Sequence, residues 1–336
     1  ALLQYFSESR GQVLDRMQGA AYKAPHKLTD GSLAGKLFGK RMRLSPSQVE
    51  RYHRCAFAYF ARDGLKIKPR RRVEFDPLES GSLVHHVLQV MVQQHGAELF
   101  TLPKAEMEAQ VREIIDGYLA ERIQQQEALP KRFSDLFRRL AASITRLLRH
   151  LGEELAQSQF KPVAFELPIS AREGVPPLEL VTADGTAVLV EGIVDRVDVM
   201  ERGENRYIRV VDYKSGGKEF RLDDVLYGLN LQMLLYLFTI AENGGGIFQN
   251  AIPAGVLYLP VHARYQNTDR DEEEEKAAAA LKRQWKMSGL LLEDETSLRG
   301  MEQELKGVFI AAKLTAGGTL DKRSALVGKA AMGRLS

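Results

Sequence analysis

Cysteine is nearly absent from this 336-residue sequence. Cys55 is its one cysteine, so no disulfide can form within the chain, and a small secreted scaffold held by disulfides is excluded. The longest apolar stretch, around residues 233–241, is far shorter than the roughly 20 residues of a membrane-spanning helix. The start lacks the basic-then-apolar pattern of a secretory signal. These absences predict a cytoplasmic protein with no membrane partner.

A strong excess of one charge is also missing. The 47 Lys and Arg residues stand against 44 Asp and Glu residues, which leaves a formal net charge of +3. So small a value does not by itself indicate a nucleic-acid partner. A hydrophobic content of 44% excludes disorder of the chain as a whole. Any case for DNA binding must therefore rest on particular residues.

The first half of the sequence has a helical pattern. Residues 45–48, Ser-Pro-Ser-Gln, have the form of a capping box with proline at the first helical position. They predict a helix that continues through Cys55 to Tyr59. Over residues 80–150, apolar side chains recur at three- and four-residue spacing. This spacing predicts several helices that form one layer.

The second half of the sequence changes character. Short β-branched runs at residues 163–169, 188–200 and 207–211 predict three consecutive strands, which suggests a meander. Residues 223–242 return to helical spacing, and residues 255–261 predict a further buried strand. Helices and strands in this order predict an α/β fold.

Two carboxylates and a lysine stand out within the predicted strands. Asp212 and Lys214 are two positions apart, so their side chains share a face, although an isolated pair of this kind is usually a surface ion pair. Asp195 interrupts an apolar run in the preceding strand, where a carboxylate is costly to bury without a cation. Asp198 is an odd number of positions from Asp195 and must face the opposite side. We assign Asp195, nearer the preceding glycine, to the site.

Such a group of residues suits a divalent cation. Two carboxylates with room for water favour Mg²⁺ or Mn²⁺, which keep several waters and bridge to phosphate oxygens. Lys214 could position an attacking water or stabilise charge at phosphorus. His85 could reach the metal from its helix, or could be a structural histidine. Gln232 and Tyr236 share a helix face that could hold a DNA strand, although Tyr236 could instead pack in the core.

Taken together, these motifs resemble the RecB-like branch of the PD-(D/E)xK nucleases. Each motif is weak alone, but the four in this order are specific: Gly81-x-x-x-His85, Gly192-x-x-Asp195, Asp212-Tyr213-Lys214 and Gln232-x-x-x-Tyr236. Residues 45–60 and 211–232 further resemble the C-terminal nuclease domain of the AddB family of bacterial helicase-nuclease subunits. The resemblance covers roughly residues 44–336.

The resemblance implies a restriction-endonuclease-like core, in which a central mixed β-sheet is flanked by helices, with an added helical region. It divides the chain into three parts. Residues 1–43 would be the tail of a preceding helicase-like region or a linker, and residues 44–160 the helical part with Cys55 and the His85 motif. Residues 161–336 would be the nuclease core with its flanking helices, which we expect to be truncated at the C-terminus.

The resemblance also implies a role for each candidate residue. His85, Asp195 and Asp212 would bind Mg²⁺ or Mn²⁺, and Lys214 would act in catalysis together with the two aspartates. The implied activity is that of a metal-dependent DNA exonuclease. It would resect the 5′-terminated strand at double-strand breaks for recombinational repair.

The implied partners are single-stranded DNA ends and a helicase subunit, AddA. Gln232 and Tyr236 would help to seat the DNA. In this family the cysteine at the position of Cys55 binds a [4Fe-4S] cluster, and the other three cysteines lie near the C-terminus. This sequence has none of those three, so its chain alone cannot hold the cluster. We expect them beyond Ser336 in a full-length protein, although a natural cluster-free variant would have the same sequence pattern.

Two other interpretations stay open. A freestanding or CRISPR-associated RecB-like exonuclease shares the four motifs and the cysteine arrangement. A DNA-binding scaffold with a nuclease fold would bind without cutting, although the intact Asp195, Asp212 and Lys214 argue against it.

Overall fold

The structure is a computed structural model. It describes residues 31–39, 41–67, 77–122, 131–183, 185–214, 222–227, 229–261, 274–321 and 325–335. Most of the predicted leading segment, residues 1–43, therefore lies outside the described residues.

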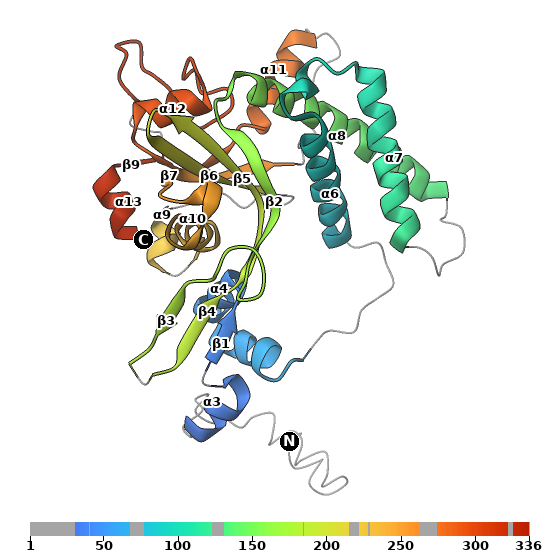
Figure 1. Cartoon of the computed structure of the whole chain (residues 1–336). Helices are drawn as coiled ribbons and strands as arrows, with labels where there is room; N and C mark the ends of the chain where they lie inside the picture. Colours follow the sequence, from blue (N-terminus) through green and yellow to red (C-terminus); the bar gives the residue numbers. More distant parts are fainter. Residues whose placement is uncertain are drawn as a thin grey trace, which may run out of the picture.

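A six-stranded mixed sheet forms the centre of the described part of the chain (Figure 1), with the strand order β2-β5-β6-β7-β8-β9. The pairs β6–β7 and β8–β9 are parallel, and the other neighbours are antiparallel. The strands are β2 (Lys161–Ile169), β5 (Gly192–Arg202), β6 (Asn205–Lys214), β7 (Ile252–Pro260), β8 (Ser288–Leu292) and β9 (Leu326–Val327). The predicted strands at residues 163–169, 207–211 and 255–261 are confirmed as parts of β2, β6 and β7.

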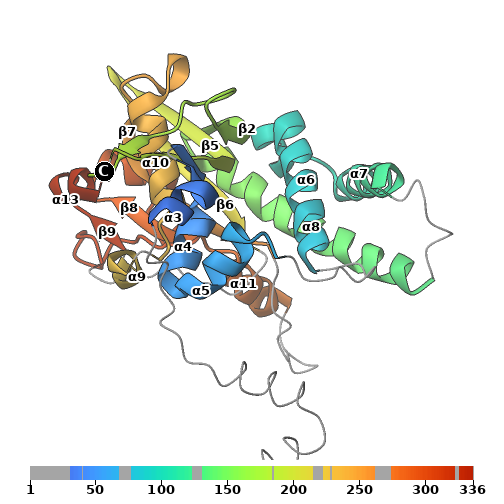
Figure 2. The same ribbon diagram turned by 90° about the horizontal axis from the view of Figure 1, so that it is seen from below.

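Three long helices cover one face of this sheet, and Figures 1 and 2 show them as one group on the same side of the strands. Leu88 and Leu147 from these helices share a buried core with Val211 and Leu257 of the sheet. Burial of such side chains is the main force that holds the helices on the sheet. The helices are α6 (Pro77–His95), α7 (Lys104–Arg122) and α8 (Lys131–Gln157). The helical layer predicted for residues 80–150 is confirmed.

The opposite face of the sheet packs against α10 (Gln232–Asn243), whose Leu237 and Ile240 are fully buried against strand residues such as Val210. With helices on both faces of a mixed sheet, the predicted α/β fold class is confirmed. The single helix predicted over residues 223–242 is wrong, because α9 (Leu222–Leu226) ends well before α10 begins.

The chain turns between these two helices at Asn230, which has a φ of 57°. The side-chain amide of Asn230 donates a 2.9 Å hydrogen bond to the Asp224 carboxylate. Asparagine tolerates this left-handed backbone better than most residues, and the side-chain bond fixes the turn.

A second, three-stranded sheet lies beyond one end of the main sheet (Figure 1). The strand predicted over residues 188–200 is wrong, because it divides at Glu191 between the two sheets. The Glu191 N–H donates to the Leu44 carbonyl, which holds the first part against β1. The predicted meander is thus interrupted by an excursion between β2 and β5. The strands of the small sheet are β1 (Arg41–Leu44), β4 (Ala187–Val190) and β3 (Glu179–Val181).

The predicted capping box begins α4 (Pro46–Arg54), where the Ser45 hydroxyl accepts from Gln48 N–H and the Gln48 side chain accepts from Ser45 N–H. The continuation of this helix through Cys55 is wrong. Cys55 has an extended backbone, with φ −163° and ψ 104°, and separates α4 from α5 (Ala56–Tyr59). The break is tolerated because the Cys55 carbonyl begins α5 by accepting from Tyr59 N–H.

The remaining helices complete the layers around the sheet. Among the residues that the structure describes, no helix has both the length and the apolar character needed to cross a membrane. These helices are α3 (Gly31–Phe38), α11 (Glu274–Gln284), α12 (Glu295–Met301) and α13 (Lys329–Leu335), with short turns at Phe60–Gly64, Gly96–Phe100 and Gly246–Phe248.

Candidate active site

Three carboxylates lie at one level of three neighbouring strands. The ladder between β5 and β6 pairs Arg196 with Val211, and one position further along, Asp195 stands opposite Asp212. On the other side of β5, the β2 register places Glu166 opposite Asp195. Residues opposite each other in antiparallel strands share a face and lie close together. Asp195 is therefore the middle member of a row of three carboxylates.

His85 reaches this row from α6, and its hydrogen bond defines which nitrogen is available. Its Nε2 lies 2.8 Å from the carbonyl oxygen of Tyr213. A carbonyl only accepts, so Nε2 carries the proton and the neutral ring keeps a lone pair on Nδ1. Nδ1 lies 3.5 Å from Asp195 Oδ2. Two acceptors that face each other in this way are stabilised by a cation between them.

The main chain of Tyr213 orients both of these groups. Its N–H donates a 2.8 Å hydrogen bond to Asp195 Oδ2, while its carbonyl accepts from His85. Hydrogen bonds from outside a ligand set commonly fix the tautomer and the orientation of metal-binding side chains. One peptide segment of β6 thus aligns an imidazole from a helix with a carboxylate from the adjacent strand.

Asp212 and Lys214 form an ion pair on β6, with 2.7 Å between Oδ2 and Nζ. Asp212 is only 5% exposed, whereas the Lys214 side chain is 28% exposed. Burial, together with the charge of Asp195, raises the pKa of Asp212 to about 6, although Lys214 opposes the rise. Burial likewise raises the pKa of Asp195, against the attraction of His85. The site therefore carries negative charge that is poorly solvated and attracts a cation.

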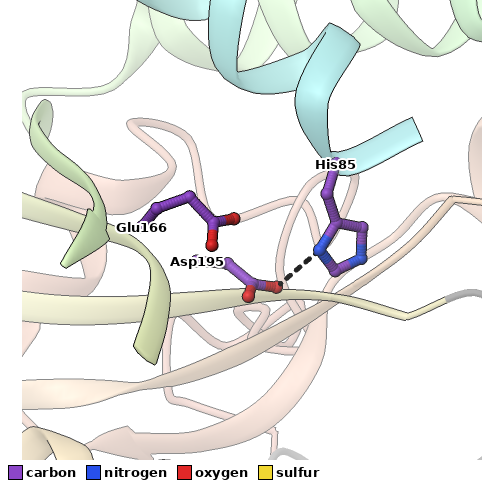
Figure 3. Close-up of side chains that lie close together, drawn as sticks. All are labelled: His85, Glu166 and Asp195. Carbon is purple, nitrogen blue, oxygen red and sulfur yellow. Dashed lines mark ion pairs between the residues drawn. The ribbon is translucent and has the colours of Figure 1, made fainter. Parts of the chain in front are cut away.

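The donor set fits a divalent metal ion. One ligand atom each from His85, Glu166 and Asp195 lies within 4.8 Å of the others, and Figure 3 shows the three side chains converging from α6, β2 and β5. Carboxylate oxygens with one imidazole suit Mg²⁺ or Mn²⁺. Of the predicted ligands, His85 and Asp195 belong to this compact group. Asp212 adjoins it on the far side of Asp195.

Glu166 is the member of this group that the sequence reasoning missed. It lies between Phe165 and Leu167 in a predicted strand. A carboxylate in an apolar strand is the same signal that identified Asp195. Applied to every predicted strand, that criterion would have found Glu166.

Tyr236 and Gln232 lie beside the carboxylates on the first turns of α10. Tyr236 is 4% exposed, and its hydroxyl is hydrogen-bonded to the Gln232 side chain and the Ile193 backbone. A Cβ at residue 192 would overlap this hydroxyl, which explains the glycine that opens β5. Burial raises the pKa of Tyr236 to about 12. The contacts of both residues with DNA stay a prediction.

A buried charge network underlies the site on the face of the sheet covered by α8. Arg209 lies 2.7 Å from Glu154 and 2.8 Å from Asp198, and Arg196 lies 2.9 Å from Asp198. Two cations and two anions balance there, and each is at most 1% exposed. As strand alternation predicts, Asp198 faces away from the candidate site. Arg196 also donates to the Tyr213 hydroxyl at 3.5 Å.

Cys55 is exposed at the junction of α4 and α5. A [4Fe-4S] cluster needs about four thiolates, and this sequence supplies one. The residues present therefore do not fit a cluster held by this chain alone.

Comparison with known proteins agrees with this geometry. The sequence model of the PD-(D/E)XK nuclease superfamily matches residues 43–323. The chain is 29% identical, over 320 residues, to the B-type subunit of the ATP-dependent helicase/deoxyribonuclease of Thermoanaerobacter sp. (strain X514), a match that covers 94% of this chain and 28% of that protein. It is 32% identical, over 295 residues, to the protein of the same name from Clostridium novyi (strain NT), a match that covers 86% of this chain and 26% of that protein.

The chain thus spans little more than a quarter of the length of these relatives. The matches confirm the family resemblance seen in the motifs. Because the superfamily match extends over most of the sequence, the chain belongs to the PD-(D/E)XK nuclease superfamily.

Proposed function

We propose that this chain is the nuclease domain of a helicase-nuclease and that it hydrolyses DNA phosphodiester bonds with a bound Mg²⁺ or Mn²⁺. The observation that carries the proposal is the convergence of His85, Asp195, Asp212 and Lys214 at the ends of β5 and β6 and at α6. The superfamily match and the names of the relatives support the same conclusion.

Each residue has a part that follows from its position. His85, through Nδ1, and the carboxylates of Asp195 and Asp212 would hold the metal ion. When bound, the ion supplies an acidified water and neutralises charge on the phosphate. Lys214 is partly exposed beside Asp212, so its ammonium can reach a substrate oxygen and stabilise the charge that develops at phosphorus. The Tyr213 main chain keeps His85 and Asp195 aligned.

The finer features of the activity come from the resemblance. We propose exonucleolytic cutting of single-stranded ends on the 5′-terminated strand, seated by Gln232 and Tyr236, during resection of double-strand breaks in the cytoplasm. A companion helicase subunit, AddA, would supply those ends. The relatives are named as subunits of an ATP-dependent helicase/deoxyribonuclease, which supports such a partner. Cys55 would contribute to a [4Fe-4S] cluster only in the full-length protein.

Cleavage of end-labelled single-stranded DNA tests the proposal. The wild-type chain with Mg²⁺ should shorten the labelled strand, and EDTA should abolish the reaction. Asp212→Ala and Lys214→Ala should lose it, whereas Asp135→Ala, which removes an exposed carboxylate on α8, should not. Equal cleavage by all variants would exclude this site. DNA binding without any cleavage would support the non-cutting scaffold instead.

A further inference from the structure

Glu166 lies on β2 in a conformation that a side chain seldom adopts. Its φ is 45°, in the left-handed region, although the residues on both sides of it pair regularly with β5. Among the residues that the structure describes, its carboxylate makes no hydrogen bond or ion pair, and it faces Asp195 across the strand pair. Like charges in such positions repel each other. Both the backbone and the charge are therefore unfavourable in the absence of a ligand, and strain of this kind is concentrated at functional sites.

We infer that Glu166 is a further protein ligand of the metal ion, an inference that rests on the proposed function. Three acceptor groups meet at one place: the lone pair on His85 Nδ1, the Asp195 carboxylate and the Glu166 carboxylate (Figure 3). No donor lies within this group of three, because the proton of His85 is directed away to the Tyr213 carbonyl. A divalent cation satisfies all three acceptors at once.

The position of Glu166 also defines which side of the site it closes. Asp195 lies between the other two carboxylates, with Glu166 toward β2 and Asp212 toward β6. Asp212 is already paired with Lys214 at 2.7 Å, whereas Glu166 has no lysine or arginine within ion-pair distance in the described part of the chain. Glu166 thus completes the coordination on the side that Lys214 leaves open.

A purely structural role makes the opposite prediction about stability. If Glu166 only supported the fold, its removal would destabilise the metal-free protein. If it is a ligand, removal relieves its repulsion with Asp195, and the metal-free protein should be as stable as wild type or more so. Stabilisation by added metal, which follows from selective binding to the folded state, should then become smaller.

Mn²⁺ binding to the whole chain, measured by isothermal titration calorimetry, tests the inference directly. We expect Glu166→Gln to raise the apparent Kd for Mn²⁺ by about tenfold or more, as loss of a supporting ligand interaction commonly does. Glu173→Gln is the matched control, because it removes an exposed carboxylate from the loop after β2 and should leave the Kd unchanged. In EDTA, Glu166→Gln should unfold at or above the wild-type temperature, with a smaller rise on adding Mn²⁺.

A second variant covers the case in which glutamine does not fold in this conformation. Glu166→Gly removes the carboxylate and readily accepts a positive φ, so it should fold and show the same weakened binding. Wild-type affinity in either folded variant would overturn the role of Glu166, while cleavage by the wild-type chain would leave the proposed function intact. A wild-type chain that neither binds Mn²⁺ nor cuts DNA would overturn both.

Discussion

Asparagine in place of Asp212 is expected to stabilise the metal-free protein at neutral pH. Burial and the nearby Asp195 raise the pKa of Asp212 from its ordinary 3.8 to about 6, even with Lys214 alongside. At about 1.4 kcal/mol per pKa unit, an ionised Asp212 lowers the stability of the native state by up to about 3 kcal/mol at pH 7. Asparagine has the same size and no charge. We therefore expect the Asp212→Asn free energy of unfolding to rise by up to this amount.

The pH dependence gives this effect a characteristic direction. The native pKa lies above the unfolded value, so between pH 3.8 and about 6 the native state binds more protons than the unfolded state. The stabilisation contributed by that proton is complete below pH 3.8 and is lost as the pH rises through about 6. Asp212→Asn lacks this titration. The difference between variant and wild type should be small near pH 4 and largest above pH 6.

Thermal unfolding in EDTA at several pH values measures the difference. One kcal/mol shifts the midpoint of a domain of 150–250 residues by about 2–4 °C, so a shift of several degrees is expected at pH 7.5. Saturating Mg²⁺ should reverse the order, because 100-fold excess over Kd adds about 2.7 kcal/mol to a protein that binds it. An Asp212→Asn variant that is less stable than wild type in EDTA at pH 7.5 would refute the reasoning.

Three further changes test other parts of the site. Lys214→Ala should slow single-turnover cleavage by about 100- to 1,000-fold while Mn²⁺ binding persists, and an unchanged rate would exclude its catalytic role. Arg209→Met should lower stability in urea by about 3–5 kcal/mol because it leaves buried carboxylates unpaired, whereas Arg206→Met, at a part-exposed ion pair, should change it by about 0.5 kcal/mol or less. Gly192→Ala should cost about 1–3 kcal/mol by crowding the Tyr236 hydroxyl, and Tyr236→Phe in the same chain should recover most of that loss.

The sequence allowed part of the site to be predicted because strand alternation is a local property. Asp212 and Lys214 share a face by their two-residue spacing, and the same alternation separates Asp198 from Asp195. His85 could be placed only through the family resemblance, because nothing in a helical period shows which strand the helix will meet. Glu166 was missed for a related reason. Its partner in the row is Asp195, 29 residues away, and the excursion through the small sheet hides their pairing.

Element boundaries failed where contacts from distant parts of the chain override local preference. Cys55 and Asn230 both interrupt apolar patterns that continue through them, since periodicity reports the buried face and not the backbone angle. At Glu191, the chain leaves one sheet for another because the Leu44 carbonyl accepts its N–H. No property of residues 188–200 indicates that such a partner exists.

Strand alternation also explains how one short segment supports a site so rich in negative charge. Asp212 and Lys214 face the candidate metal position, while the intervening Tyr213 is turned to the opposite face and is buried. There its hydroxyl accepts from Arg196, within a network of balanced buried charges. Tyr213 is held by its side chain on one face, so its main chain can hold His85 and Asp195 at a fixed spacing. Since the metal site carries three carboxylates against one lysine, this rigid support from the far face keeps the ligands together until a cation binds.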